Sequence, residues 1–160
     1  MNGITELNVT ENISLVTFNK APTDCTFIVA AFDEFAKRGI NIDMISQTAP
    51  QGDTVSFSFT VSDNDVVAAL EAIRSIRELC PSVVPLVTSG NCKLQLYGVE
   101  MKEMSGVGAA VIKAVSASGA QIIIITTSEV DISILTSPAK LSECISALEA
   151  SFGVAAKHTV

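Results

Sequence analysis

The segment Gly39-Ile-Asn-Ile-Asp-Met-Ile-Ser-Gln-Thr48 decides the fold, because a similar segment occurs a second time in the chain. Gly119-Ala-Gln-Ile-Ile-Ile-Ile-Thr-Thr-Ser128 follows about 80 positions later and shares its opening glycine, apolar centre and polar end. Ala69-Leu-Glu-Ala72 recurs as Ala147-Leu-Glu-Ala150 at nearly the same spacing. Two independent matches at one spacing predict a duplicated unit of roughly 70 to 80 residues, and therefore two small domains of one fold.

Strand and helix patterns alternate in the first copy. Thr23 and Asp24 can cap a helix that Gly39 terminates. A second helix carries an apolar stripe, and one strand alternates apolar residues with Ser and Thr, as a half-buried strand does. The expected elements are strand 13–18, helix 24–39, strand 40–45, strand 55–61, helix 66–76 and strand 83–87.

The second copy repeats this order. Ser89-Gly-Asn91 is the candidate linker before it, and Ser137-Pro138 suits the N-cap and first position of its last helix. Ile122 to Ile125 are expected to form a buried strand. The other expected elements are strand 94–99, helix 107–119, strand 132–134, helix 138–152 and a closing strand over 154–160.

Each unit is thus βαββαβ, an α+β ferredoxin-like arrangement with an antiparallel four-stranded sheet and two helices on one face. The expected domain bounds are 1–88 and 92–160. Residues 1–11 carry Ile4, Leu7 and Val9, and they form an extra strand either for the first unit or for the second. Units of this size are marginal alone, so pairing within or between chains is expected.

Composition limits the classes of partner. The 160 residues are 48% hydrophobic with a net charge of −7, and no run of Lys or Arg offers a nucleic-acid surface. The longest apolar stretches, such as Phe27 to Phe32, fall short of the roughly 20 residues that span a bilayer. A basic segment followed by an apolar one is lacking at the N-terminus, so no signal peptide is predicted and a cytoplasmic location is expected.

Catalytic motifs are missing from the sequence. It contains no phosphate-binding Gly-rich loop and no Gly-x-Ser-x-Gly elbow, and its one histidine, His158, lies near the end. Cys25, Cys80, Cys92 and Cys144 lack the spacing of a zinc or redox motif, so they are expected to be reduced thiols packed as small apolar groups. We therefore predict no catalytic residue, no metal and no cofactor, and the chain alone is not an enzyme.

Two kinds of position could hold a small zwitterion. The strand-to-helix loops Lys20–Asp24 and Lys102–Val107 offer helix N-termini that favour a carboxylate. The strand ends Ile45–Thr48 and Ile125–Glu129 supply hydroxyl, amide and carboxylate groups for an ammonium. A capped helix and a polar turn explain the same residues without a ligand. Asp43 stands out among the acidic residues, because strand alternation places it on a half-buried face.

At these residues the chain resembles the tandem ACT domains that form the regulatory part of bacterial aspartokinase. Residues 39–47 are close to the family's Asn-Ile-Asp-Met-Ile-x-Gln strand, and 127–133 are close to its Ser-Thr-Ser-Glu-Ile-x-Ile-Ser. Met101-Lys102 followed by Gly106-Val107 matches the loop before the second unit's first helix. The match covers almost the whole chain, and its three motifs stand in the family's order.

The resemblance implies an allosteric module that binds lysine, threonine or both and thereby controls the phosphorylation of aspartate. Its implied partners are an amino-acid effector, an aspartokinase catalytic domain or subunit, and a second copy of the chain in a homodimer. No part of the chain resembles the kinase domain. By analogy, the effector-binding residues are Pro22, Thr23, Asp24, Cys25, Asn41, Asp43 and Gln47 in the first unit, and Met104, Ser105, Gly106, Val107, Gln121, Ile122, Thr127, Ser128 and Glu129 in the second.

The chain departs from the family pattern before its first helix. The family commonly reads Asp-x-Pro-Gly, whereas this chain has Lys20, Pro22 and Thr23. A ligand ammonium that faced the family's Asp would face Lys20 here. Two alternatives therefore stay open beside the effector-binding region: a pair of ACT domains that only dimerises a larger protein, and a free-standing amino-acid sensor.

Overall fold

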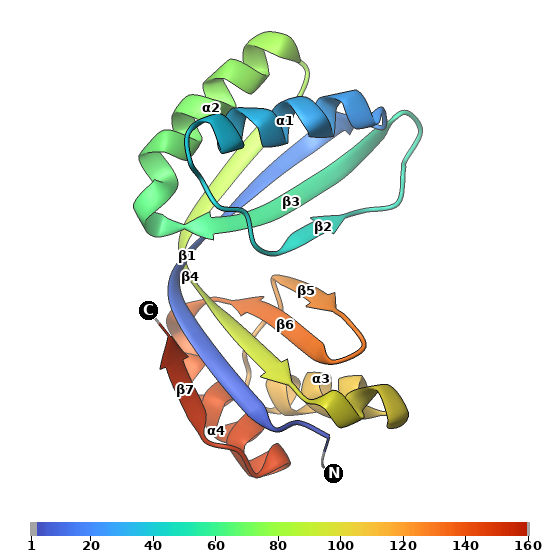
Figure 1. The fold of residues 1–160 in the computed structure, drawn as a ribbon, viewed down its shortest axis with the longest axis vertical. Helices are drawn as coiled ribbons and strands as arrows, with labels where there is room; N and C mark the ends of the chain where they lie inside the picture. Colours follow the sequence, from blue (N-terminus) through green and yellow to red (C-terminus); the bar gives the residue numbers. More distant parts are fainter. Residues whose placement is uncertain (1–2, 160) are drawn as a thin grey trace. The chain divides into compact units, whose positions relative to one another are not determined.

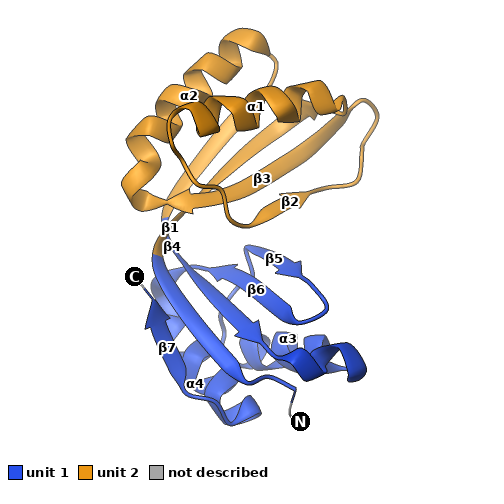
Figure 2. Ribbon diagram, in the orientation of Figure 1, with its two compact units in different colours: residues 1–11, 90–160 blue, residues 12–89 orange. Residues whose placement is uncertain are grey.

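The computed structural model describes residues 3–159, which divide between two units with separate hydrophobic cores (Figures 1 and 2). The first unit comprises residues 12–89, and the second unit joins residues 3–11 to residues 90–159. Both units are built from antiparallel strands and helices, which confirms the predicted α+β class. Two long strands, β1 (Glu6–Pro22) and β4 (Val84–Tyr97), contribute residues to both units.

The first unit has the strand order β2-β3-β1-β4, with both helices over one face of the sheet (Figure 1). Strand β3 pairs antiparallel with β1 on one side and with β2 on the other. The order along the chain is the expected one, because helices follow the first and third strands. The remaining bounds are α1 (Cys25–Lys37), β2 (Ile45–Gln47), β3 (Thr54–Ser62) and α2 (Val66–Leu79).

Aromatic rings fill the first core. Phe59 on β3 is fully buried, and its ring lies 4.8 Å from that of Phe35 on α1 at an interplanar angle of 90°. Phe18, Phe32 and Phe57 also contact Phe59 within ring-centroid distances of 5.7 to 6.1 Å. Edge-to-face rings at such distances stabilise a core beyond the area that they bury. Phe27, Ala31 and Phe35 recur every fourth residue along α1, so they lie on one face of the helix and pack in this core.

The second unit has the strand order β7-β1-β4-β6-β5. Strand β6 pairs antiparallel with β4 and β5, whereas β7 runs parallel to β1, with Leu7 opposite Ala156. Its bounds besides β1 and β4 are η2 (Val99–Glu103), α3 (Val107–Ala117), β5 (Ile124–Thr127), β6 (Asp131–Thr136), η3 (Pro138–Lys140), α4 (Leu141–Phe152) and β7 (Ala156–Thr159). The expected closing strand over 154–160 begins two residues late, and its last residue lies outside the described ones.

The N-terminal strand belongs to the second unit. Ile4, Leu7 and Val9 are each at most 1% exposed and pack in the second core, among the side chains of β4 and β6. The expected domain boundary at residue 1 therefore differs from the structure, in which the first unit begins at residue 12. The alternative prediction, that the N-terminal residues form an extra strand of the second unit, agrees with it. The reason is physical: strand β7 needs a partner, and β1 lies between it and β4.

The expected linker is no loop. Ser89-Gly-Asn91 lies inside β4, although the boundary between the units does fall between Ser89 and Gly90. Asn91 and Cys92 are only 6% and 1% exposed. Because β1 runs beside β4, the backbone can pass from one unit to the other within strand structure, without the irregular connection that the Ser-Gly-Asn sequence indicates.

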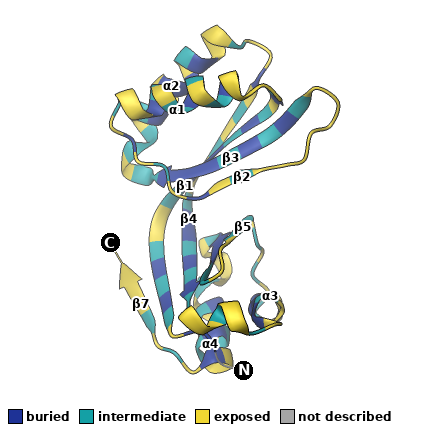
Figure 3. Ribbon diagram, turned by 45° about the vertical axis from the view of Figure 1, so that its right-hand side comes forward, coloured by how far each residue is buried: buried dark blue, intermediate teal, exposed yellow. Residues whose placement is uncertain are grey.

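Strand β5 is less buried than expected. Ile123 and Ile125 are 39% and 37% exposed, while Ile124 is half-buried. The strand lies at the edge of its sheet and pairs only with β6 (Figure 3). In an edge strand that is covered on one face, every second side chain is exposed, whatever the residue types are. The continuous apolar run 122–125 therefore predicted more burial than the structure has.

Candidate functional site

A cavity of about 360 Å³ in the second unit gathers three segments that are separate in the sequence. They are the turn around η2, the start of α3 and the turn that follows β5, and Ile132 on β6 completes the wall. Its lining residues are Met101, Lys102, Met104, Gly106, Val107, Gly108, Thr127, Ser128, Glu129 and Ile132. Of the nine residues predicted for this unit, all line the cavity except Ser105, Gln121 and Ile122.

The N-terminus of α3 faces this cavity without a side-chain cap. Its N-cap residue is Gly106, with φ 89°, a left-handed conformation that costs glycine nothing and that other residues adopt with strain. Gly106 has no side chain that could accept a hydrogen bond from the first turn. The leading N–H groups of a helix have no intrahelical acceptor and carry a partial positive charge, so this end of α3 suits a carboxylate.

One cation and one anion line the same cavity. Lys102 and Glu129 are both exposed, and neither forms an ion pair within residues 3–159. Met101, Met104 and Ile132 add an apolar wall. An uncapped helix, an ammonium and a carboxylate around one cavity can bind both charges of a zwitterion. The sequence did contain the signal for Lys102, which stands in the loop picked out before α3.

Ser128 holds the turn after β5 in shape. Its hydroxyl donates to Asp131 Oδ1 at 2.7 Å and accepts from the backbone N–H groups of Val130 and Asp131 at 3.2 and 3.1 Å. The side-chain amide of Gln95 donates to the other oxygen of Asp131 at 2.9 Å. Ser128 therefore positions its neighbours Thr127 and Glu129, and its own hydrogen-bonding capacity is largely used.

The corresponding cavity of the first unit is lined by other residues than those predicted. It measures about 300 Å³ and lies beside Asn19, Lys20, Thr48, Gln51, Thr54, Val55 and Ser56. Pro22, Thr23, Asp24 and Cys25 instead span the end of β1 and the start of α1, Asn41 and Asp43 precede β2, and Gln47 ends it. Asp43 is exposed rather than half-buried, because burial alternates along residues 42–45 and turns Met44, not Asp43, toward the core.

Asp24 already occupies the N-terminus of α1. Its carboxylate accepts from the backbone N–H of Thr26 at 2.8 Å and from the Thr26 hydroxyl at 2.6 Å. These two hydrogen bonds hold the pKa of Asp24 below its ordinary value. A second carboxylate at this helix end would meet like charge, so the two units differ in what their helix N-termini can accept.

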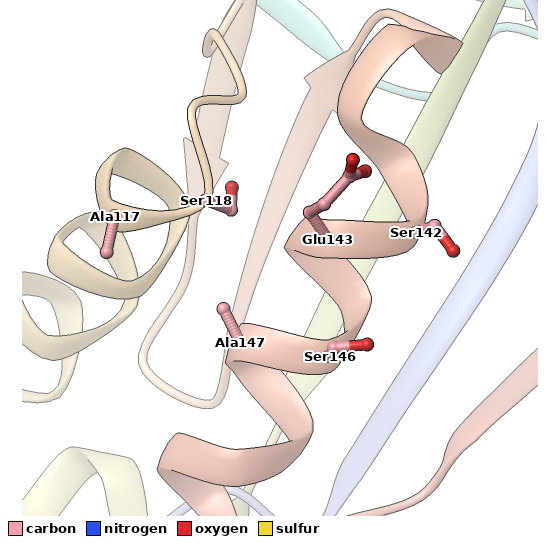
Figure 4. A pocket seen from close by; sticks show the side chains of 6 residues that line it. All are labelled: Ala117, Ser118, Ser142, Glu143, Ser146 and Ala147. Carbon is pink, nitrogen blue, oxygen red and sulfur yellow. The ribbon is translucent and has the colours of Figure 1, made fainter.

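A larger cavity, of about 650 Å³, lies between the end of α3 and α4 (Figure 4). Its lining residues are Ala117, Ser118, Ser142, Glu143, Ser146 and Ala147. Glu143 lies 3.8 Å from the Lys140 ammonium. Because the one charged residue of its lining is paired with Lys140, this cavity offers fewer charged groups to a ligand than the cavity at the start of α3.

The described residues, 3–159, contain no cluster of metal-ligating side chains and no disulfide. No three His, Cys, Asp or Glu side chains there lie close enough to hold a metal ion. All four cysteines are free, Cys92 and Cys144 are buried, and burial raises the pKa of the Cys144 thiol. None of the described helices is long and apolar enough to cross a membrane.

Comparison with known families explains the duplication. Family models described as ACT domain match residues 27–78 and, separately, residues 94–152. The chain contains two ACT domains. They coincide with the two units of the structure, since each match lies within one unit.

The relatives of these ACT domains are aspartate kinases. The regulatory subunit of aspartate kinase from Thermus thermophilus, in a ligand-free form, superposes with a TM-score of 0.88 at 25% identity over 94% of this chain and 99% of that one. Aspartate kinase from Synechocystis gives a TM-score of 0.92 at 22% identity, over 99% of this chain but 28% of that one. The Mycobacterium tuberculosis aspartokinase (strain H37Rv) is 30% identical over 141 residues, which are 87% of this chain.

The ACT pair thus matches the regulatory region of aspartate kinases, as the sequence motifs indicated. It spans about a third of the length of the curated aspartokinases that it matches, 34% of the mycobacterial one. Because a regulatory subunit covers nearly the whole chain, these two domains are the regulatory rather than the catalytic part of such an enzyme.

Proposed function

We propose that the cavity at the start of α3 binds an amino-acid effector, lysine or threonine, and that this binding regulates an aspartate kinase. The observation that carries the proposal is the meeting of an uncapped helix N-terminus, Lys102 and Glu129 around one cavity. The effector's α-carboxylate would lie at the N–H groups that follow Gly106, and an ammonium group would lie at Glu129.

Regulation requires that the effector bind two states unequally. The effector would contact α3 and the turn after β5 at once, and so favour one arrangement of these segments. The partner that reads this arrangement would be an aspartokinase catalytic domain or subunit, in the cytoplasm. Seven residues of the first unit remain predicted effector-binding residues, although none of them lines the cavity described for that unit. They are Pro22, Thr23, Asp24, Cys25, Asn41, Asp43 and Gln47.

A thermal-shift scan of the chain against the twenty amino acids tests the proposal. A ligand that binds only the folded state at 100 times its Kd adds about 2.7 kcal/mol of stability, so a specific effector raises the Tm measurably. We expect lysine or threonine to do so. Glu129→Gln should weaken the effect about tenfold, because a charge-assisted contact is lost.

Glu103→Gln is the matched control, since it removes the same charge from an exposed position at the end of η2 that does not line the cavity. A Tm that ignores every amino acid would contradict the proposal. Equal losses from Glu129→Gln and Glu103→Gln would also contradict it, because they would reveal a general effect of net charge.

A second function, dimerisation, is favoured by the sheet edges. Strands β2 and β5 each pair on one side only, and Ile45, Ile123 and Ile125 on or beside them are 48%, 39% and 37% exposed. Exposed apolar edge strands invite pairing with another chain. We propose a homodimer through these edges, which sedimentation velocity over a concentration series would detect. Ile45→Lys and Ile125→Lys should give a monomer, and Val67→Lys, which changes an exposed helix residue, should not.

A further inference from the structure

The cavity of the first unit has the composition of an anion site. Its lining residues include one cation, Lys20, and no carboxylate, whereas the cavity of the second unit has both Lys102 and Glu129. The nearby acidic residues stand outside the lining: Asp24 is bonded to Thr26 at the start of α1, and Asp53 precedes Thr54 in an exposed turn. No carboxylate in this lining complements the charge of an ammonium group.

A bulge in β1 directs Lys20 to this place. Phe18 pairs with Phe57 and Ala21 pairs with Val55, so that two residues of β1, Asn19 and Lys20, stand opposite one residue of β3. Lys20 has φ 55°, a left-handed conformation that is strained for a residue with a side chain. Bulges of this kind redirect side chains at the edges of sites.

Three side chains around the cavity carry hydrogen-bond donors that have no acceptor among residues 3–159. The Asn19 carbonyl oxygen accepts from the Ser56 hydroxyl, which leaves the NH₂ group of Asn19 for another partner. Within residues 3–159, the Lys20 ammonium and the side-chain amide of Gln51 have no hydrogen bond or ion pair either. The Thr48 and Thr54 hydroxyls donate only at 3.5 and 3.4 Å, distances that leave them able to turn.

We propose that this cavity of Asn19, Lys20, Thr48, Gln51 and Thr54 binds a small oxyanion without an ammonium group, either a dicarboxylate or a phosphate-bearing molecule. The ammonium and the two amides would donate to the anion's oxygens, and the hydroxyls would turn to donate as well. An amino acid is disfavoured, because its ammonium would face the like charge of Lys20 with no carboxylate in the lining to pair with it. The two ACT domains then respond to different chemistries, a zwitterion in one and an anion in the other.

Two-dimensional NMR of the ¹⁵N-labelled chain tests this, because it reports each cavity separately. The probes are succinate, inorganic phosphate, lysine and threonine. We expect succinate or phosphate to shift the amide signals of residues 19–20 and 48–56, and the tighter of the two probes identifies the anion as a carboxylate or a phosphate. Lysine and threonine should leave these signals unchanged. Signals of residues 102–108 and 127–129 report the proposed effector site, so the failure of one proposal is distinguishable from the failure of the other.

Substitution of Lys20 sharpens the test. Lys20→Gly removes the ammonium while suiting the left-handed backbone, so the variant should fold and bind the anion about tenfold more weakly. Lys20→Arg should retain binding. Lys37→Gln, which lowers the charge by the same amount on the exposed end of α1, is the control and should retain binding too. The proposal is overturned if lysine or threonine shifts residues 19–20 and 48–56 as strongly as succinate, if neither anion shifts them, or if Lys37→Gln weakens binding as much as Lys20→Gly.

Discussion

Asp24 and Gly106 are the N-cap residues of the first helix in the two ACT domains. The helix N-terminus is capped by a side chain in the first domain and is uncapped in the second. Asp24 supplies a carboxylate to its own helix, whereas Gly106 supplies no side chain at all. One residue therefore decides whether the helix N-terminus is satisfied internally or is open to a ligand. This difference was visible in the sequence as a departure from the repeat, but its meaning needed the cap geometry.

Asp24→Ala should destabilise the first unit in a pH-dependent manner. The hydrogen bonds from Thr26 lower the pKa of Asp24, so they stabilise the fold fully above the ordinary carboxyl pKa of about 3.9. That contribution is lost as the pH falls through the lower pKa of the folded state. The Tm of the variant should thus lie below that of the wild type at neutral pH, and the gap should close in acid.

Thermal unfolding followed by circular dichroism from about pH 2 to 7 measures this gap across the titration. Asp33→Ala, on the exposed face of α1, removes the same charge without removing a cap and should give a smaller gap. A gap for Asp24→Ala that stays constant through the acid range would show that its carboxylate charge contributes nothing.

Gly98→Ala should destabilise the second unit by about 2 kcal/mol or more, as overpacked backbone contacts do. A Cβ at Gly98 would lie 1.6 Å from the carbonyl oxygen of Gly3 and 3.1 Å from the Cα of Ile4, so the N-terminal segment would have to move. Urea denaturation measures the loss. Gly108→Ala, where an added Cβ meets nothing within 4 Å, should instead stabilise the protein by about 0.5 to 1 kcal/mol through helix propensity. A neutral Gly98→Ala would contradict the close approach.

At the scale of elements, periodicity and repeat matching predicted the type and order of the helices and strands. They could not predict which sheet takes the N-terminal strand, because the apolar residues Ile4, Leu7 and Val9 suit any half-covered sheet. Ser89-Gly-Asn91 was predicted to be a linker from its turn-forming residues, but it lies within β4 because this strand pairs with β1. Likewise, the sequence could name the loops of the second cavity, Met104 included, but not Ile132, which reaches the cavity from strand β6.

Deleting residues 1–11 should unfold the second unit. The deletion removes the parallel partner of β7 and three side chains from the second core. Full burial of each such side chain contributes about 1.5 to 3 kcal/mol, and their sum approaches the whole stability of a typical domain. Amide hydrogen exchange should show loss of protection in β4, β6 and β7. Leu7→Ala is the milder form and should cost about 2 to 5 kcal/mol, whereas Glu11→Ala, an exposed position, should cost little. Unchanged protection in β7 after the deletion would contradict the assignment.

At the scale of the whole molecule, the two ACT domains share two strands, so their stabilities should be linked. Phe59→Ala removes the centre of the first unit's aromatic cluster and should cost about 3 to 5 kcal/mol. Strands β1 and β4 carry this loss into the second unit, because each contributes residues to both. A single cooperative transition at lower temperature is therefore expected.

The composition provides a local reporter for this test. The chain has one tyrosine and no tryptophan, and Tyr97 lies in the second unit, so tyrosine fluorescence follows that unit alone. In Phe59→Ala, unfolding monitored by Tyr97 should coincide with unfolding monitored by circular dichroism. A Tyr97 transition that keeps its wild-type midpoint would show that the two domains unfold independently.

The placement of residues 3–11 has a further consequence when the protein is made on the ribosome. This strand emerges from the ribosome before the rest of the two domains, yet its partner β7, where Leu7 meets Ala156, emerges after them. The first unit is complete once Ser89 has emerged and can fold during translation, whereas the strand over residues 3–11 must stay unpaired with β7 until residues 156–159 have been made. Within the two domains, the strand that is made first is thus among the last to be paired, and a nascent chain stalled before β7 would expose it to chaperones.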